Sequence, residues 1–269
     1  MAQLISADEI YQLVSVYAEP VKHIRRHLHQ YPELSFEEYK TSEFIQQQLK
    51  QAGIPFTTGH VKTGIIALIK GNNPDKKTIL LRADMDALPI TEKNEVAYKS
   101  CNAGVMHACG HDAHSACALG AAFILNRLKN QFEGTVKIMF QPGEELLPGG
   151  ASLMIKEGVL ENPRVDKAIA LHVFPSMEAG KVGFKSGMYM ASTDELYLTI
   201  NGKGGHAAMP AEYNNPLLIG AEILLAVQNK FMRPGALKGT AGENIPTVVA
   251  FGKIEGKGAT NVVPASVEL

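Results

Sequence analysis

The sequence predicts an α/β protein: a largely parallel central sheet flanked by helices, followed by a second, smaller α/β domain. Short apolar runs alternate with segments whose apolar residues recur at helical spacing. The run at 78–82 is of the kind expected when both faces of a strand are covered. Near residue 185 the pattern changes, and 196–201 alternates strictly between apolar and polar residues. We therefore expect a first domain over 1–185 and a second domain over 186–269.

The expected helices each carry a recognisable boundary signal. Pro32 follows the amphipathic segment 7–30, Gly53 stops the next helix, and Asp112 is expected to cap the third. Helices are expected at 7–30, 35–51, about 113–129, 149–157 and 216–231. Strands are expected at 64–70, 78–82, 136–141, 167–172, 196–201, 247–254 and 262–269.

Composition excludes several classes of protein. The chain has 26 basic and 27 acidic side chains and no basic stripe, so we expect no nucleic-acid partner and no anionic membrane surface. The most apolar stretch, 116–125, is too short to span a bilayer. Three cysteines argue against a disulfide scaffold, and the acidic N-terminus does not resemble a signal peptide. The sequence therefore predicts a soluble, cytoplasmic protein.

Polar side chains follow three of the expected strands. Asp84 and Asp86 come after the strand ending at 82, Glu144 and Glu145 after the strand ending at 141, and His172 ends a third. In open α/β sheets, sites form beyond the carboxyl ends of the strands. The segment 109–111 would join them from the loop before the next helix. We expect these groups to converge.

The residue types at this edge favour a divalent metal. A cysteine and a histidine two residues apart, Cys109 and His111, precede the positive end of a helix, which favours a thiolate. Glu145 and His172 are further candidate ligands. Of two adjacent glutamates, one can bind metal while the other takes a proton from water. The chemistry predicted is hydrolysis by a metal-activated water.

Other interpretations of these residues stay open. Cys109 could be a buried apolar residue, the glutamate pair a solvated turn, and His172 a core histidine. Either His107 or His114 could instead orient a ligand. A cysteine hydrolase is a further alternative, although it would not need the paired glutamates.

His206 lies in a glycine-rich segment, 202–210. The glycine spacing is not that of a nucleotide-binding loop and no Lys-Ser/Thr follows, so phosphate binding is disfavoured. An imidazole held by glycines beside a half-open sheet can instead stabilise an oxyanion on a substrate.

Taken in order, these motifs resemble the zinc-metallopeptidase family that contains aminoacylase, in its amidohydrolase branch. The resemblance runs almost the whole length of the chain. It rests on 27–38 (HLHQYPELSFEE), 81–89 (LRADMDALP), 106–114 (MHACGHDAH), 141–145 (QPGEE), 171–172 (LH), 205–207 (GHA) and 258–264 (GATNVVP).

The resemblance implies residue roles and partners. Cys109, His111, Glu145 and His172 would bind two divalent ions (Zn, Mn, Co or Ni), and Glu144 would be the general base. Asp86 would orient a ligand, whereas Asp84 replaces the first ligand of the wider family. His206 and Asn261 would reach the substrate, a small N-acylated amino acid. The first domain, 1–185, would be the catalytic metal-binding domain, and the second, 186–269, would be a lid that also forms a homodimer.

The resemblance also implies one departure. Family members continue beyond the point where this chain stops and supply a last histidine ligand, yet none of the nine histidines here lies beyond 206. The chain is therefore expected to be C-terminally truncated, with an incomplete second domain. The alternative to an amidohydrolase is a truncated, catalytically impaired metal-binding protein of the same family.

Overall fold

The computed structural model describes residues 5–187, 189, 193–232 and 248–269, which fall into two compact units, Met1–Lys181 and Val182–Leu269. The division lies just before the boundary expected at 185. Helices in the described part are α1 (Ala7–Gln30), α2 (Tyr39–Gln51), α3 (His111–Leu128), α4 (Gly150–Lys156) and α5 (Pro216–Phe231), with short 3-10 turns η1 (Pro74–Lys76) and η2 (Lys129–Gln131). Strands are β1 (Phe56–His60), β2 (Gly64–Lys70), β3 (Thr78–Asp84), β4 (Thr135–Gln141), β5 (Lys167–Ala170), β6 (Thr199–Asn201), β7 (Gly205–His206), β8 (Val262–Val263) and β9 (Ser266–Glu268).

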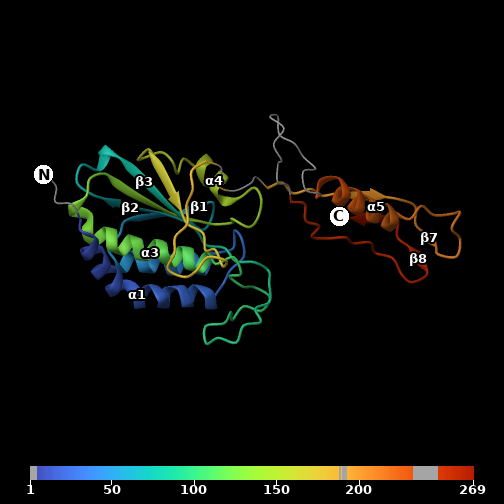
Figure 1. Cartoon of the computed structure of the whole chain (residues 1–269), viewed down its shortest axis with the longest axis horizontal. Coiled ribbons are helices and arrows are strands. Elements are labelled where there is room, and N and C mark those ends of the chain that lie inside the picture. The colour runs from blue at the N-terminus through green and yellow to red at the C-terminus, as the bar shows by residue number, and fades with distance from the viewer. Residues whose placement is uncertain (1–4, 188, 190–192, 233–247) are drawn as a thin grey trace. The chain divides into compact units, whose positions relative to one another are not determined.

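The first unit is built on a five-stranded sheet in the order β1-β2-β4-β3-β5 (Figure 1). β3 runs parallel to both β4 and β5, whereas β2 is antiparallel to β1 and β4. The α/β class is confirmed, but the sheet is mixed rather than largely parallel. The difference arises from β2, which runs opposite to the other strands of this sheet. A tight turn at Val61 and Lys62, with φ of 47° and 73°, joins it as a hairpin to β1, a strand that the sequence pattern does not reveal. Hairpin strands are antiparallel.

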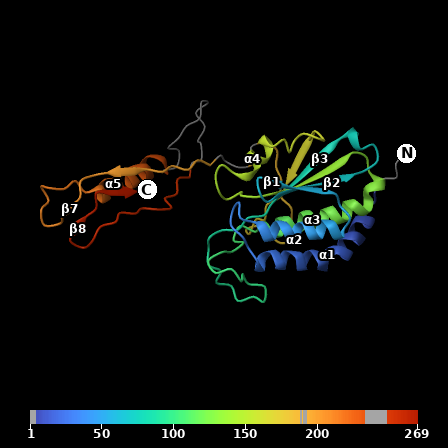
Figure 2. The ribbon, with the colours of Figure 1, turned by 180° about the vertical axis from the view of Figure 1, so that it is seen from behind.

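Helices cover both faces of this sheet. The helices α1, α2 and α3 lie on one face and α4 on the other (Figures 1 and 2). The larger apolar core lies under the three helices and includes Leu28 and Leu119 packed with Ile65 and Phe140. Residues of alternate orientation on the same strands, such as Ile66 and Met139, pack with Met154 of α4. This double coverage explains why β2, β3 and β4 read as apolar runs.

Two expected helix starts are corrected by the structure. The second helix begins at Tyr39 rather than at Ser35, because 35–38 forms a loop. The third begins at His111, after Gly110 in the left-handed conformation, and has no side-chain cap. The Asp112 carboxylate is instead buried against His29 and Arg25, with Oδ2 lying 2.8 Å from His29 Nδ1 and from Arg25 Nε. A partner on α1 therefore takes Asp112 away from the capping role.

The second unit holds two small antiparallel ladders, β6 with β9 and β7 with β8. Helix α5 packs on β6 and β9, where Val267 is buried. The expected strand at 196–201 is shortened to β6. Residues 248–254 form no strand, and Thr247 lies outside the described residues. Among the described helices, none combines the length and the apolar character that a membrane span requires.

Candidate metal centre

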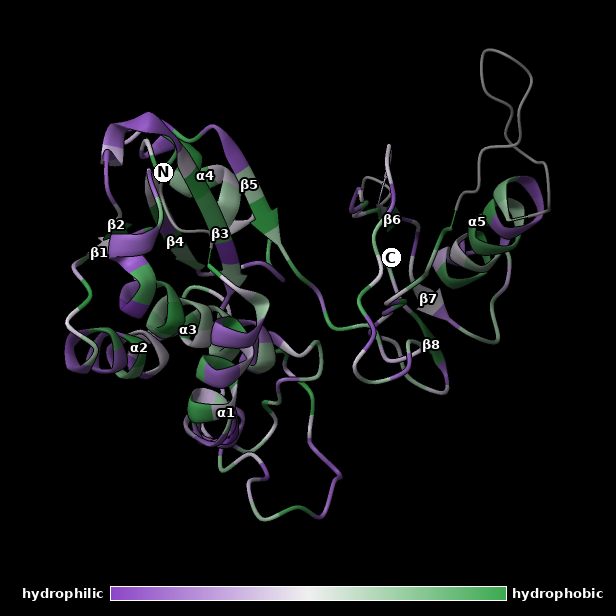
Figure 3. Ribbon diagram, turned by 60° about the vertical axis from the view of Figure 1, so that its left-hand side comes forward, coloured by the Kyte–Doolittle hydropathy of each residue, from purple (hydrophilic) through white to green (hydrophobic). Residues whose placement is uncertain are grey.

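The carboxyl ends of the parallel strands and the start of α3 meet at one edge of the first unit. In Figure 3, β3 is hydrophobic through its middle and hydrophilic toward its end, where Arg82 and Asp84 lie. β4 ends at Gln141, directly before the turn that carries Glu144, and the chain leaves β5 just before His172. Because β3 is parallel to both neighbours, these ends lie side by side. The convergence expected from the sequence is therefore present.

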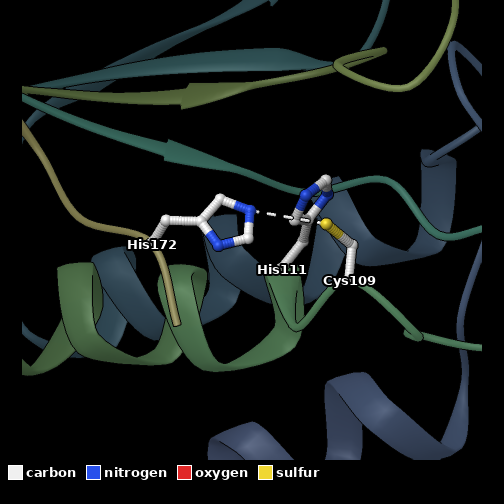
Figure 4. Close-up of side chains that lie close together, drawn as sticks. All are labelled: Cys109, His111 and His172. Atoms are coloured by element: carbon white, nitrogen blue, oxygen red, sulfur yellow. Dashed lines mark hydrogen bonds between the residues drawn. The ribbon is translucent and has the colours of Figure 1, made fainter. Parts of the chain in front are cut away.

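Three residues expected as ligands, together with the expected base Glu144, gather around His111. The Cys109 Sγ atom lies 3.4 Å from His172 Nε2, and the three side chains point toward one another (Figure 4). His111 Nε2 lies 3.7 Å from Glu145 Oε1 and 4.0 Å from Glu144 Oε2. Within each of two sets, Cys109–His111–His172 and His111–Glu144–Glu145, one ligand atom per residue lies within 4.8 Å of the others. These distances suit groups that surround a cation.

The ring of His111 is held so that its Nε2 faces the cluster. Its Nδ1 lies 2.9 Å from the backbone oxygen of Asp86 and 3.2 Å from Asp86 Oδ1. Since a carbonyl oxygen only accepts hydrogen bonds, Nδ1 carries the proton and Nε2 is left with a lone pair. The second Asp86 oxygen accepts hydrogen bonds from Ser35 Oγ at 2.7 Å and from the backbone N–H of Glu145 at 2.9 Å. Asp86 therefore links His111, Ser35 and the backbone of Glu145.

The cluster contains two buried polar atoms without a hydrogen-bond partner, His111 Nε2 and Glu145 Oε1, which lie 3.7 Å apart. Asp84 Oδ2 lies 3.8 Å from His111 Nε2 but is paired with Arg82 Nη1 at 2.5 Å. Burying polar atoms without partners costs about 1–3 kcal/mol each. Because a cation would satisfy both atoms, and because sulfur, nitrogen and oxygen donors together suit a divalent transition metal, these residues fit a metal ion.

A third possible set, Asp84, His111 and His114, is less suited to binding metal. His114 Nδ1 lies 2.6 Å from Asp84 Oδ1, and His114 Nε2 accepts the backbone N–H of Val173 at 2.9 Å. Both ring nitrogens are therefore occupied. The sequence leaves open whether His107 or His114 orients a ligand. His114 contacts the cluster through Asp84. His107 is buried, and neither of its ring nitrogens has a hydrogen-bond partner among the described residues.

The electrostatics of the cluster correct one expectation. Burial and the neighbouring Glu145 carboxylate raise the pKa of the Cys109 thiol to about 12. The helix N-terminus is expected to favour the thiolate, but in the metal-free protein burial, followed by the surrounding carboxylates, opposes ionisation of this thiol. Burial, followed by the charge of Glu145, also raises the pKa of Glu144. Burial raises the pKa of Asp84, but the hydrogen bond with His114 and the charge of Arg82 outweigh it, so the pKa falls to about 2.

Two residues that support the cluster were not expected as site residues. Ser35 binds Asp86, and the buried Glu38 accepts hydrogen bonds from the backbone N–H of Gly143 at 2.8 Å and from Thr63 Oγ1 at 2.6 Å. Glu38 thus anchors the turn before Glu144. In the sequence, both residues lie in the motif 27–38, which contributes to the family resemblance but suggests no role for a particular side chain.

His206 and Asn261 lie together in the second unit. β7 pairs with β8, and the N–H of Ala207 donates to the backbone oxygen of Asn261 at 3.0 Å. His206 Nδ1 accepts the N–H of Ala208 at 3.2 Å, which leaves Nε2 as the protonated nitrogen. His206 is exposed.

Comparison with known proteins shows where the chain belongs. Residues 80–263 match the model of Peptidase family M20/M25/M40. The chain is 38% identical over 265 residues to an N-acyl-L-amino acid amidohydrolase of Geobacillus stearothermophilus, covering 98% of this chain and 69% of that protein. It is 41% identical over 244 residues to an N-acetyl-L-cysteine deacetylase of Bacillus subtilis, covering 91% and 56% respectively.

A solved structure gives the same assignment. The Bacillus subtilis YXEP protein, described as a dinuclear metal-binding peptidase from the M20 family, superposes with a TM-score of 0.70 at 33% identity. The match covers 94% of this chain and 63% of that one. The chain thus spans between about half and two thirds of the length of most relatives it matches. The family model over residues 80–263 and the similarity to these relatives show that the chain belongs to Peptidase family M20/M25/M40.

Proposed function

We propose that this protein is a metal-dependent amidohydrolase that cleaves the amide bond of small N-acylated amino acids. The observation that carries the proposal is the set of unpartnered donor atoms around His111, with Glu144 beside it. The substrate class is supported by the relatives named N-acyl-L-amino acid amidohydrolase and N-acetyl-L-cysteine deacetylase. We further propose that the protein acts in the cytoplasm as a homodimer joined through 186–269.

Cys109, His111, Glu145 and His172 would hold the metal. His111 offers one lone pair and can therefore bind only one ion, although it belongs to both sets of donors. The other ligands would contribute to a second metal site, which the likeness to a dinuclear relative favours. A divalent ion bound here would acidify a water molecule and polarise the amide carbonyl. Its identity among Zn, Mn, Co and Ni is left open by the mixed donor set.

Glu144 is placed to move the proton. Its carboxylate lies 4.0 Å from His111 Nε2 and is about 40% exposed, so it reaches both the cluster and solvent. The raised pKa of this carboxyl, caused by burial and by Glu145, makes it a stronger base than an ordinary glutamate. Glu144 would take a proton from water and deliver it to the leaving amine. His206 would donate to the developing oxyanion and Asn261 would bind the substrate.

The test of this proposal replaces Glu144 with glutamine. In Glu144→Gln the metal ligands remain, so we expect unchanged metal content and turnover of N-acetyl or N-benzoyl amino acids reduced by about 10²–10⁴-fold, the usual contribution of a general base. Near-normal turnover would rule out the role of Glu144. Metal binding by the wild type with no amide turnover on any such substrate would favour the metal-binding protein without catalysis.

A further inference from the structure

His172 lies beyond the end of β5, and contacts with other elements hold it in place. It follows β5, whose four residues are all exposed, so the packing of β5 does little to fix the segment beyond it. The next residue, Val173, makes two contacts with the start of α3. Its backbone N–H donates to His114 Nε2 at 2.9 Å. Its side chain fills the space beside Gly110, where an added Cβ would lie 2.4 Å from Val173 Cγ2.

We propose that His114 is a positioning residue that, with Gly110, docks the segment 172–173 onto the first turn of α3 and so sets His172 beside Cys109. The rings of His114 and His172 stand edge to face, with centroids 4.6 Å apart. His172 Nε2 then lies 3.4 Å from Cys109 Sγ. This inference rests on the proposed function, because it takes His172 to be a metal ligand.

The hydrogen bonds of His114 fix both its tautomer and its orientation. Since a backbone N–H only donates, Nε2 is the acceptor and Nδ1 carries the proton given to Asp84 Oδ1 at 2.6 Å. His114 is about 1% exposed, and Ser115 Oγ donates to the Asp84 backbone oxygen at 2.7 Å. The ring therefore ties the end of β3 to the segment after β5. It has no lone pair free for a metal, so its effect on metal is exerted through Val173.

Two substitutions separate the contacts of His114. In His114→Asn the shorter amide stays near the position of Nδ1 and keeps a donor for Asp84, but Val173 loses its acceptor. In His114→Gln the amide reaches the position of Nε2 and its oxygen can accept from Val173, whereas the donor to Asp84 is lost. Each variant gives up one buried hydrogen bond. A merely structural role would therefore affect both equally.

The experiment measures Zn²⁺ and Mn²⁺ affinity by calorimetry, and the visible spectrum of the Co²⁺-loaded protein, for the wild type, both variants, His172→Ala and the double variant His114→Asn/His172→Ala. We expect His114→Asn to weaken metal binding by about 10–100-fold, as loss of a supporting contact commonly does, and to change the Co²⁺ spectrum. His114→Gln should retain most of the affinity. In the His172→Ala background, His114→Asn should cause no further loss, because the ligand it positions is absent.

Three outcomes would overturn the inference: wild-type affinity and spectrum in His114→Asn, equal losses in the asparagine and glutamine variants, or additive losses in the double variant. Circular dichroism and thermal melting show whether each variant is folded. Absence of metal binding by the wild-type protein would instead contradict the proposed function. Wild-type binding combined with an unaffected His114→Asn would leave the function standing and remove only the role of His114.

Discussion

The Cys109 thiol lies among carboxylates that oppose its ionisation. With its pKa raised to about 12 by burial and by Glu145, the thiol of the metal-free protein is protonated at neutral pH. A metal ligand, however, must be a thiolate. Metal binding should therefore release a proton from Cys109, and in Cys109→Ser that proton should not be released near neutral pH.

Calorimetry in two buffers with different ionisation enthalpies measures the number of protons released on metal binding. We expect roughly one more proton from the wild type than from Cys109→Ser. Equal proton release from the two proteins would show that Cys109 is not a ligand.

His29 lies between two carboxylates in the network that holds Asp112. Its Nδ1 lies 2.8 Å from Asp112 Oδ2 and its Nε2 lies 3.1 Å from Glu92 Oε1. The hydrogen bond with Asp112, opposed by burial and aided by Glu92, raises the pKa of His29 above 6.5. The stabilisation from charged His29 is therefore complete below pH 6.5 and is lost as pH rises through the raised pKa.

Replacing His29 by glutamine keeps polar contacts but removes the titrating group. We expect the free energy of unfolding of the wild type to fall above pH 6.5, and that of His29→Gln to fall less over the same range. Urea denaturation at a series of pH values measures both. An equal decline of the free energy of unfolding in the two proteins would show that His29 does not cause the pH dependence.

At the scale of elements, the start of α3 depends on Gly110. With φ of +90° and Val173 against its backbone, this position resists any side chain. In Gly110→Ala we expect the 172–173 segment to be displaced and metal affinity to fall by about tenfold or more. Gly104→Ala is the matched control, because Gly104 also has positive φ, of +77°, but faces open space.

Thermal melting and metal titration of both alanine variants test this expectation. Both should lose some stability from backbone strain, whereas only Gly110→Ala should bind metal more weakly. Equal metal affinity in the two variants would mean that Val173 does not depend on Gly110.

The sequence predicted elements well where local signals agree with packing. The segments 64–70 and 216–231 carry clear apolar patterns or boundaries and were placed with the bounds the structure has. The sequence does not predict an element or a contact that depends on a partner distant in the chain. Asp112 looks like a cap, but His29, far away in the chain, binds it. β1 has little apolar character and exists because it pairs with β2.

The same distinction applies to the cluster. The sequence predicts that Cys109, Glu145 and His172 lie together because strand ends and residue chemistry are visible in it, and the structure brings them together; their role as metal ligands stays a prediction. The contacts of Ser35, Glu38 and His114 are not predicted, because each joins segments brought together only by the fold. The raised pKa of Cys109 was missed for the same reason, since the carboxylates around it come from other elements.

At the scale of the whole molecule, we expect bound metal to stabilise the first unit. The cluster joins β3, α3 and the segments after β4 and β5, all within Met1–Lys181. Saturating metal should therefore slow amide hydrogen exchange at 84–86, 109–114, 143–146 and 171–173. Protection confined to the second unit would contradict this placement.

The most direct test of the metal centre is anomalous diffraction from crystals grown with Zn²⁺ or Mn²⁺. We predict one or two peaks, each within about 2.0–2.3 Å of donor atoms drawn from Cys109, His111, Glu145 and His172 for zinc. Well-ordered side chains with no anomalous peak among these four residues, or a peak found only elsewhere in the protein, would contradict the proposed metal centre.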